Sequence, residues 1–135
     1  MTVAAHQRVN ILLVDDRVEN LVALESILEA PDYRLVRAQN GQDALLAVLA
    51  DDFAAIVLDV QMPGMSGIEL AQLIRQRRKS QHVPILFLTA HGDQSAIDGY
   101  QAGAVDFLTK PVQPAVLRSK VAVFAELYRK SAALQ

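Results

Sequence analysis

Acidic, hydroxyl and ammonium side chains stand at the ends of four apolar runs in this chain. They are Asp15, Asp16, Asp59, Thr89 and Lys110. In a parallel sheet, ligands bind outside the carboxyl ends of the strands, so polar residues at strand ends are placed to do chemistry. If the four runs are strands of one such sheet, all of these side chains share one rim.

Three carboxylates on one rim repel one another unless some are protonated or a cation lies between them. The ligands would all be oxygen atoms, with no His or Cys among them, and such ligands favour Mg²⁺ or Mn²⁺ over zinc. Magnesium keeps several water ligands and is commonly bound together with phosphate oxygens. Asp15, Asp16 and Asp59 therefore predict a divalent cation that helps to receive a phosphoryl group.

Each of these residues also has an ordinary structural explanation. An Asp pair after a strand can form a turn or a helix cap. Thr89 can cap the next helix, and Lys110 can be a solvated surface charge. Their joint placement at four successive strand ends is what favours the functional interpretation.

The elements that must position these residues are five short strands, each followed by a helix. The expected strands are residues 9–14, 35–38, 54–58, 85–88 and 104–108. Helical spacing follows each strand, with the fourth helix over 94–102 and the last one after Pro114. The strands are continuous apolar runs, which indicates a parallel sheet covered on both faces. We predict an α/β fold of the doubly wound type.

The composition fits one soluble domain. The chain has 135 residues, of which 52% are hydrophobic and 21% are charged. Its net charge of -2 argues against direct binding of a nucleic-acid backbone. There is no Cys, no signal-peptide pattern and no apolar run long enough to span a membrane, so we expect a cytoplasmic protein.

Four motifs make the chain resemble the receiver domains of response regulators. They are Leu13-Val14-Asp15-Asp16, the run LDVQMPGMSG at 58–67, Leu88-Thr89-Ala90, and the run GAVDFLTKP at 103–111. The resemblance extends from Val9 to Tyr128 and implies a flavodoxin-like (βα)5 sheet in strand order 2-1-3-4-5. It also implies a switch in a two-component phosphorelay, phosphorylated by a histidine kinase or a phosphotransfer protein.

The same resemblance implies a role for each residue of the rim. Asp59 would be the nucleophile that accepts the phosphoryl group. The ligands of Mg²⁺ (or Mn²⁺) would be Asp15, Asp16, Asp59 and the backbone carbonyl of Gln61. Lys110 would pair with Asp59 and then with a phosphoryl oxygen, and Thr89 would hydrogen-bond the phosphoryl group.

Two further positions concern the switch. Phe107 takes the place of an aromatic switch residue that moves between outward and inward rotamers. The family often has Tyr there, so any hydrogen bond from that hydroxyl is lost, and a plain core aromatic is the alternative. The Lys110–Pro111 bond is expected to be cis, as the family resemblance implies.

Turnover of the phosphoryl group is expected to be slow. Gln61 and His91 stand two residues beyond Asp59 and Thr89, and we predict that they tune hydrolysis of the acyl phosphate. Phosphatases of the haloacid-dehalogenase class have a second acid where this chain has Gln61. We therefore expect a regulatory phosphoacceptor with slow autodephosphorylation rather than an enzyme of rapid turnover.

The last helix is longer than packing on one domain requires. We expect an N-terminal tail at 1–8, the receiver domain at 9–125, and a helical extension at 126–135. The extension should have little surface to pack on, so we expect it to pair with a copy of itself or to continue into an output module, and we hypothesise a homodimer through it. A frayed, solvated end is the alternative.

Two other functions would use the same fold. An FMN binder would need a loop rich in Ser, Thr and Gly after the first strand, where this chain has two acids and Arg17. A receiver-like interaction module that acts without phosphorylation would not need the acceptor site. Every residue of that site is present, so we favour the phosphoacceptor switch.

Overall fold

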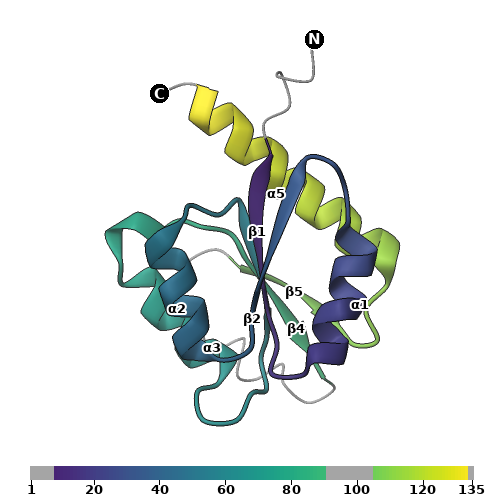
Figure 1. Ribbon diagram of the computed structural model, residues 1–135, viewed down its shortest axis with the longest axis vertical. Helices are drawn as coiled ribbons and strands as arrows, with labels where there is room; N and C mark the ends of the chain where they lie inside the picture. Colours follow the sequence, from purple (N-terminus) through teal and green to yellow (C-terminus); the bar gives the residue numbers. More distant parts are fainter. Residues whose placement is uncertain (1–7, 91–104, 134–135) are drawn as a thin grey trace.

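A computed structural model describes residues 8–90 and 105–133. Five parallel strands form a single sheet in the order β2-β1-β3-β4-β5 (Figure 1). The strands are β1 (Val9–Val14), β2 (Tyr33–Ala38), β3 (Ala55–Asp59), β4 (Ile85–Thr89) and β5 (Val105–Thr109). The predicted α/β fold and its strand order are confirmed.

Helices cover both faces of this sheet. The described ones are α1 (Val18–Leu28), α2 (Gly41–Ala50), α3 (Gly67–Arg75), the short 3-10 helix η2 (Arg78–Ser80) and α5 (Pro114–Ala133). Figure 1 shows α1 and α5 on one side of the sheet and α2 and α3 on the other. The helix predicted over 94–102 lies outside the described residues.

Two hydrophobic clusters, one on each face, make up the core. Alternate residues of β1 point to opposite faces, so Leu12 belongs to the cluster under α2 and α3, and Leu13 to the cluster under α1 and α5. All residues of β3 are buried. This central strand carries Asp59 at its carboxyl end, so the acid is held by a strand packed on both sides.

The edge strand β2 begins two residues earlier than its apolar residues predicted. The predicted strand began at Leu35, whereas β2 starts at Tyr33 and pairs with β1 from its first residue. Arg34 and Arg37 are exposed on this edge strand. An edge strand needs fewer apolar residues than a central one, so the sequence signal there is weaker.

The carboxyl half of α5 contacts the domain more than we expected. Tyr128 packs against the cluster under α1 and α5, and the guanidinium of Arg129 lies 2.7 Å from a carboxylate oxygen of Asp32. The expectation that the segment from Glu126 onward has little surface to pack on is wrong for these two residues. Within 8–90 and 105–133, no helix combines the length and apolar character needed to cross a bilayer.

Candidate functional site

The polar residues predicted to share a rim lie at or just after the carboxyl ends of the strands. Asp15 follows β1 directly, Asp59 ends β3, Thr89 ends β4, and Lys110 follows β5. The parallel register aligns these ends, because Asp59 is paired with Leu88 and Thr89 with Thr109. The rim inferred from the sequence is therefore present in the fold.

Three carboxylates meet on this rim. One oxygen from each of Asp15, Asp16 and Asp59 lies within 4.8 Å of the other two. Asp15 is 1% exposed and Asp59 is 4% exposed, whereas Asp16 is half-buried. Such close oxygen ligands suit a hard divalent cation, which would remove the repulsion between partly desolvated charges. The donor set therefore fits Mg²⁺ or Mn²⁺.

Lys110 lies beside the central acid of this cluster. Its Nζ is 3.2 Å from Oδ1 of Asp59, and the backbone N–H of Gln61 donates to the same oxygen at 3.3 Å. Burial raises the pKa of Asp59, and the nearby Asp15 charge raises it further, while Lys110 and the Gln61 N–H lower it. Burial is the largest of these effects, so the net direction is upward.

The loop after β3 packs closely against the backbone of Asp59 and Val60. The N–H of Gly67 donates to the carbonyl of Val60 at 2.8 Å. A Cβ at Gly67 would lie 2.2 Å from the carbonyl oxygen of Asp59, so only glycine permits this approach. Ser66 and Glu69 form a capping box that starts α3 at this point. The start of α3 is therefore held directly against the end of β3, where Asp59 lies.

Asp15 is held by residues that our sequence analysis did not identify. The N–H of Arg17 donates to its Oδ1 at 2.9 Å. Nδ2 of Asn20 lies 3.2 Å from Oδ1 and 3.1 Å from Oδ2 of the same carboxylate. The sequence places Asn20 in the first turn of the helix that follows the Asp pair, but an amide at such a position is common and does not by itself predict this contact.

The remaining predicted positions are Thr89, Phe107, the Lys110–Pro111 bond and His91. Thr89 is buried, and its hydroxyl donates a long hydrogen bond of 3.5 Å to the carbonyl of Leu108. Phe107 is partly buried against the cluster under α2 and α3. The Lys110–Pro111 peptide bond is cis. His91 lies outside the described residues.

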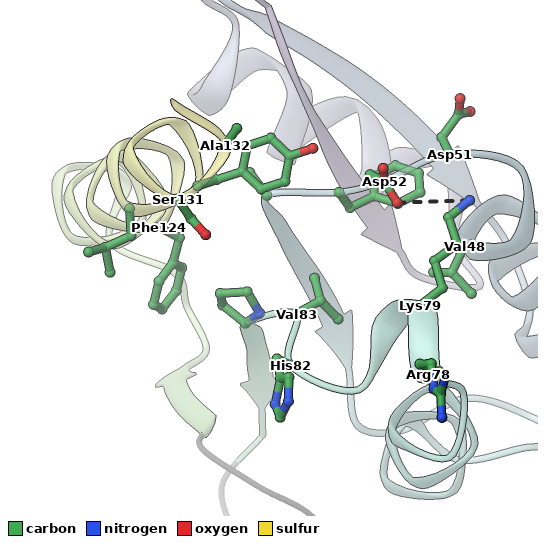
Figure 2. A pocket seen from close by; sticks show the side chains of 15 residues that line it. Val48, Asp51, Asp52, Arg78, Lys79, His82, Val83, Phe124, Ser131 and Ala132 are labelled. Carbon is green, nitrogen blue, oxygen red and sulfur yellow. Dashed lines mark ion pairs between the residues drawn. The ribbon is translucent and has the colours of Figure 1, made fainter. Parts of the chain in front are cut away.

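A separate pocket lies at the amino end of the sheet, away from the acidic rim. It has a volume of about 460 Å³ and lies between the carboxyl half of α5, the loop before β3 and the segment from η2 to β4. Figure 2 shows Phe124, Ser131 and Ala132 on one side and Lys79 paired with Asp52 on the other. This pocket contains none of the residues predicted to do chemistry.

Comparison with known proteins relates the chain to response regulators. A family model described as the response regulator receiver domain matches residues 11–122. The transcriptional regulatory protein ResD of Bacillus subtilis is 37% identical over 113 residues, which is 82% of this chain and 46% of that protein. The chain thus spans about half the length of this curated relative.

Solved structures resemble the chain over most of its length. A putative response regulator from Chloroflexus aurantiacus is 36% identical with a TM-score of 0.80, over 89% of this chain and 99% of that one. The receiver domain of the sensor histidine kinase PA1611 from Pseudomonas aeruginosa is 28% identical with a TM-score of 0.78, over 88% and 98%. That structure has a magnesium ion coordinated in its active-site cleft.

Proposed function

Because the chain belongs to the response regulator receiver domain family, we propose that it is a phosphoacceptor switch in which Asp59 takes a phosphoryl group from a histidine kinase or phosphotransfer protein. The observation that carries this proposal is the arrangement around Asp59. The acid is buried at a strand end, beside two further carboxylates and 3.2 Å from the ammonium group of Lys110.

The transfer is a displacement at phosphorus. A carboxylate oxygen of Asp59 forms the new P–O bond while the P–N bond to the donor histidine breaks. The imidazole leaves with the electron pair of that bond, and a proton restores its neutral form. Lys110 moves its hydrogen bond from Asp59 to a phosphoryl oxygen, and the hydroxyl of Thr89 donates to another.

A divalent cation would be held by carboxylates of the rim. Its proposed ligands are Asp15, Asp16, Asp59 and the backbone carbonyl of Gln61. When bound, Mg²⁺ or Mn²⁺ supplies positive charge that offsets the charge on the transferring group. The three carboxylates support this assignment because they are close together and all of them offer oxygen donors.

Thr89 and Phe107 are the residues proposed to change conformation in response to phosphorylation. Thr89 ends β4 and Phe107 lies on the neighbouring strand β5, where Phe87 is its paired residue. Movement of Thr89 toward the phosphoryl group would change the space available to the Phe107 ring. Gln61 and His91 are proposed to tune hydrolysis, which would be slow, so the chain acts as a regulatory domain.

The proposed partner is the histidine kinase or phosphotransfer protein that donates the phosphoryl group. A histidine kinase uses ATP, so the proposed place of action is the cytoplasm. The chain matches 46% of ResD, and the output would be carried by a partner or by a segment outside this sequence. We propose no direct nucleic-acid contact for these residues, since their net charge is -2.

We also propose a homodimer through α5. Val123 and Leu127 on this helix are 56% and 57% exposed, which places two large apolar side chains one turn apart on its surface. Sedimentation of the natural chain and of Leu127→Glu, each with and without phosphorylation, tests this. A monomer for the natural chain in both states at high concentration contradicts the dimer.

The phosphoacceptor is tested by intact-protein mass spectrometry after incubation with acetyl phosphate and Mg²⁺. We expect one base-labile phosphoryl adduct in the natural chain and in Asp52→Asn, whose carboxylate is at the other end of the sheet. The adduct should be absent in Asp59→Asn and in EDTA. No adduct under any condition would favour the alternative, an interaction module that acts without phosphorylation.

A further inference from the structure

Asn20 of α1 holds both carboxylate oxygens of Asp15. Its Nδ2 lies 3.2 Å from Oδ1 and 3.1 Å from Oδ2, and it is part-buried in the first turn of the helix. A single amide that bridges two oxygens fixes the plane of the carboxylate as well as its position. Asp15 is 1% exposed, so water has little access to take over this contact.

We propose that Asn20 is a positioning residue that orients Asp15 for a divalent cation. This inference rests on the metal site of the proposed function. Groups that hydrogen-bond a metal ligand commonly set its orientation, and their loss typically lowers metal affinity about 10–100-fold. Asn20 has the geometry of such a group, because it contacts Asp15 through both oxygens without being a metal ligand itself.

Asn20 is uncharged, and this suits a residue beside a cation site. An Arg or Lys in this place would orient Asp15 equally well, but its positive charge would repel the cation. The one cationic residue nearby in sequence, Arg17, contributes only its backbone N–H to Asp15. Its side chain pairs with Glu19 at 3.1 Å on the surface. Within the described part of the chain, Asp15 thus has hydrogen-bond donors but no cationic side chain bonded to it.

The test is the dissociation constant of Mg²⁺, measured by isothermal titration calorimetry on the full chain. The variants are Asn20→Leu, which keeps the approximate size and removes the donor, Asn20→Ala, and Asn20→Gln, which keeps an amide. The matched control is Asn10→Leu. Asn10 also donates through Nδ2, to the carbonyl of Asp52 at 2.9 Å, but it lies at the amino end of the sheet.

We expect Asn20→Leu and Asn20→Ala to raise the dissociation constant about 10–100-fold and Asn20→Gln to raise it less. Asn10→Leu should leave it unchanged, and thermal denaturation in EDTA should show that all variants are folded. Dissociation constants within twofold of the natural value for both Asn20→Leu and Asn20→Ala overturn the inference about Asn20 alone. A natural chain that binds no Mg²⁺ overturns this inference together with the proposed metal site.

Discussion

Nζ of Lys110 lies 3.2 Å from Oδ1 of Asp59, and this contact joins the ends of β5 and β3 across the end of β4. The carboxylate is 6% exposed and the ammonium side chain 34% exposed, so the pair is largely shielded on the acid side. A charged hydrogen bond in such a place contributes about 1.5–3 kcal/mol. It ties the proposed acceptor to the strand that carries Phe107.

Replacing Lys110 with Met should slow phosphorylation of Asp59 by acetyl phosphate about 10–100-fold. The variant cannot make the charged hydrogen bond that Lys110 is proposed to donate to a phosphoryl oxygen during transfer. The measurement is the initial rate of adduct formation by mass spectrometry at fixed Mg²⁺. Lys120→Met is the control, because Lys120 pairs with Asp106 instead. Equal rates for the natural chain and Lys110→Met would contradict the role given to Lys110.

Replacing Asp59 with Asn should stabilise the metal-free domain at neutral pH by about 1 kcal/mol, or roughly 4 °C in Tm. The pKa of Asp59 is raised above 3.8, mainly by burial, so the folded state holds its ionised form at a cost. Between 3.8 and the raised pKa, the folded natural chain binds more protons than the unfolded chain. The unfolding free energy of the natural chain therefore gains from protonation of Asp59 as pH falls through that range.

The difference in unfolding free energy between Asp59→Asn and the natural chain should consequently be largest at pH 7 and decrease as pH falls toward 3.8. Urea denaturation in EDTA at several pH values measures this difference. Asp52→Asn, which changes an exposed acid, controls for net charge. A difference that grows on acidification would mean that the pKa of Asp59 is lowered by folding.

Gly67→Ala should destabilise the domain by about 1–3 kcal/mol and slow phosphorylation, because the added Cβ would push against the backbone of Asp59. Gly64→Ala is the comparison. Gly64 has a φ of 82°, so alanine is strained there, but a Cβ at Gly64 meets no atom within 4 Å. Gly64→Ala should lower the free energy of unfolding by about 1–2 kcal/mol. Asp59 of this variant should still be phosphorylated at the natural rate. Similar rates for both variants would argue against a positioning effect of Gly67.

The ion pair between Arg129 and Asp32 should make the carboxyl half of α5 part of the folded unit. Arg129→Met is expected to lower the free energy of unfolding by about 1 kcal/mol, since both side chains are only partly shielded from water. Lys130→Met, one residue later and exposed, should have little effect. Urea denaturation of both variants measures the difference, and equal stabilities would support a solvated helix end.

Much of the fold could be predicted because its strands are continuous apolar runs. Residues 9–14 were predicted as a strand and form β1, and the predicted 54–58 is displaced by one residue from β3. Strand order cannot be derived from apolar periodicity, and it came from the family resemblance. The edge strand β2 was underestimated because Tyr33 and Arg34 carry no strong apolar signal.

The acidic rim could be predicted because it follows from strand ends in a parallel sheet. The contacts that position its members could not, since they join residues from different elements. Asn20 reaches Asp15 only when α1 packs beside β1, and Gly67 reaches Asp59 only when α3 begins under β3. No local pattern distinguishes these two residues from an ordinary helix amide and an ordinary turn glycine.

The division of the core into two clusters has a thermodynamic consequence. Leu24 in α1 and Ile74 in α3 belong to different clusters on opposite faces of the sheet. Substitutions at such distant sites usually have additive free energies, so a double-mutant cycle between these two positions should give an interaction energy near zero. The rim is different, because Asn20 approaches it from one face and Gly67 from the other. Non-additivity between the two faces should therefore be concentrated in pairs that include Asp15 or Asp59.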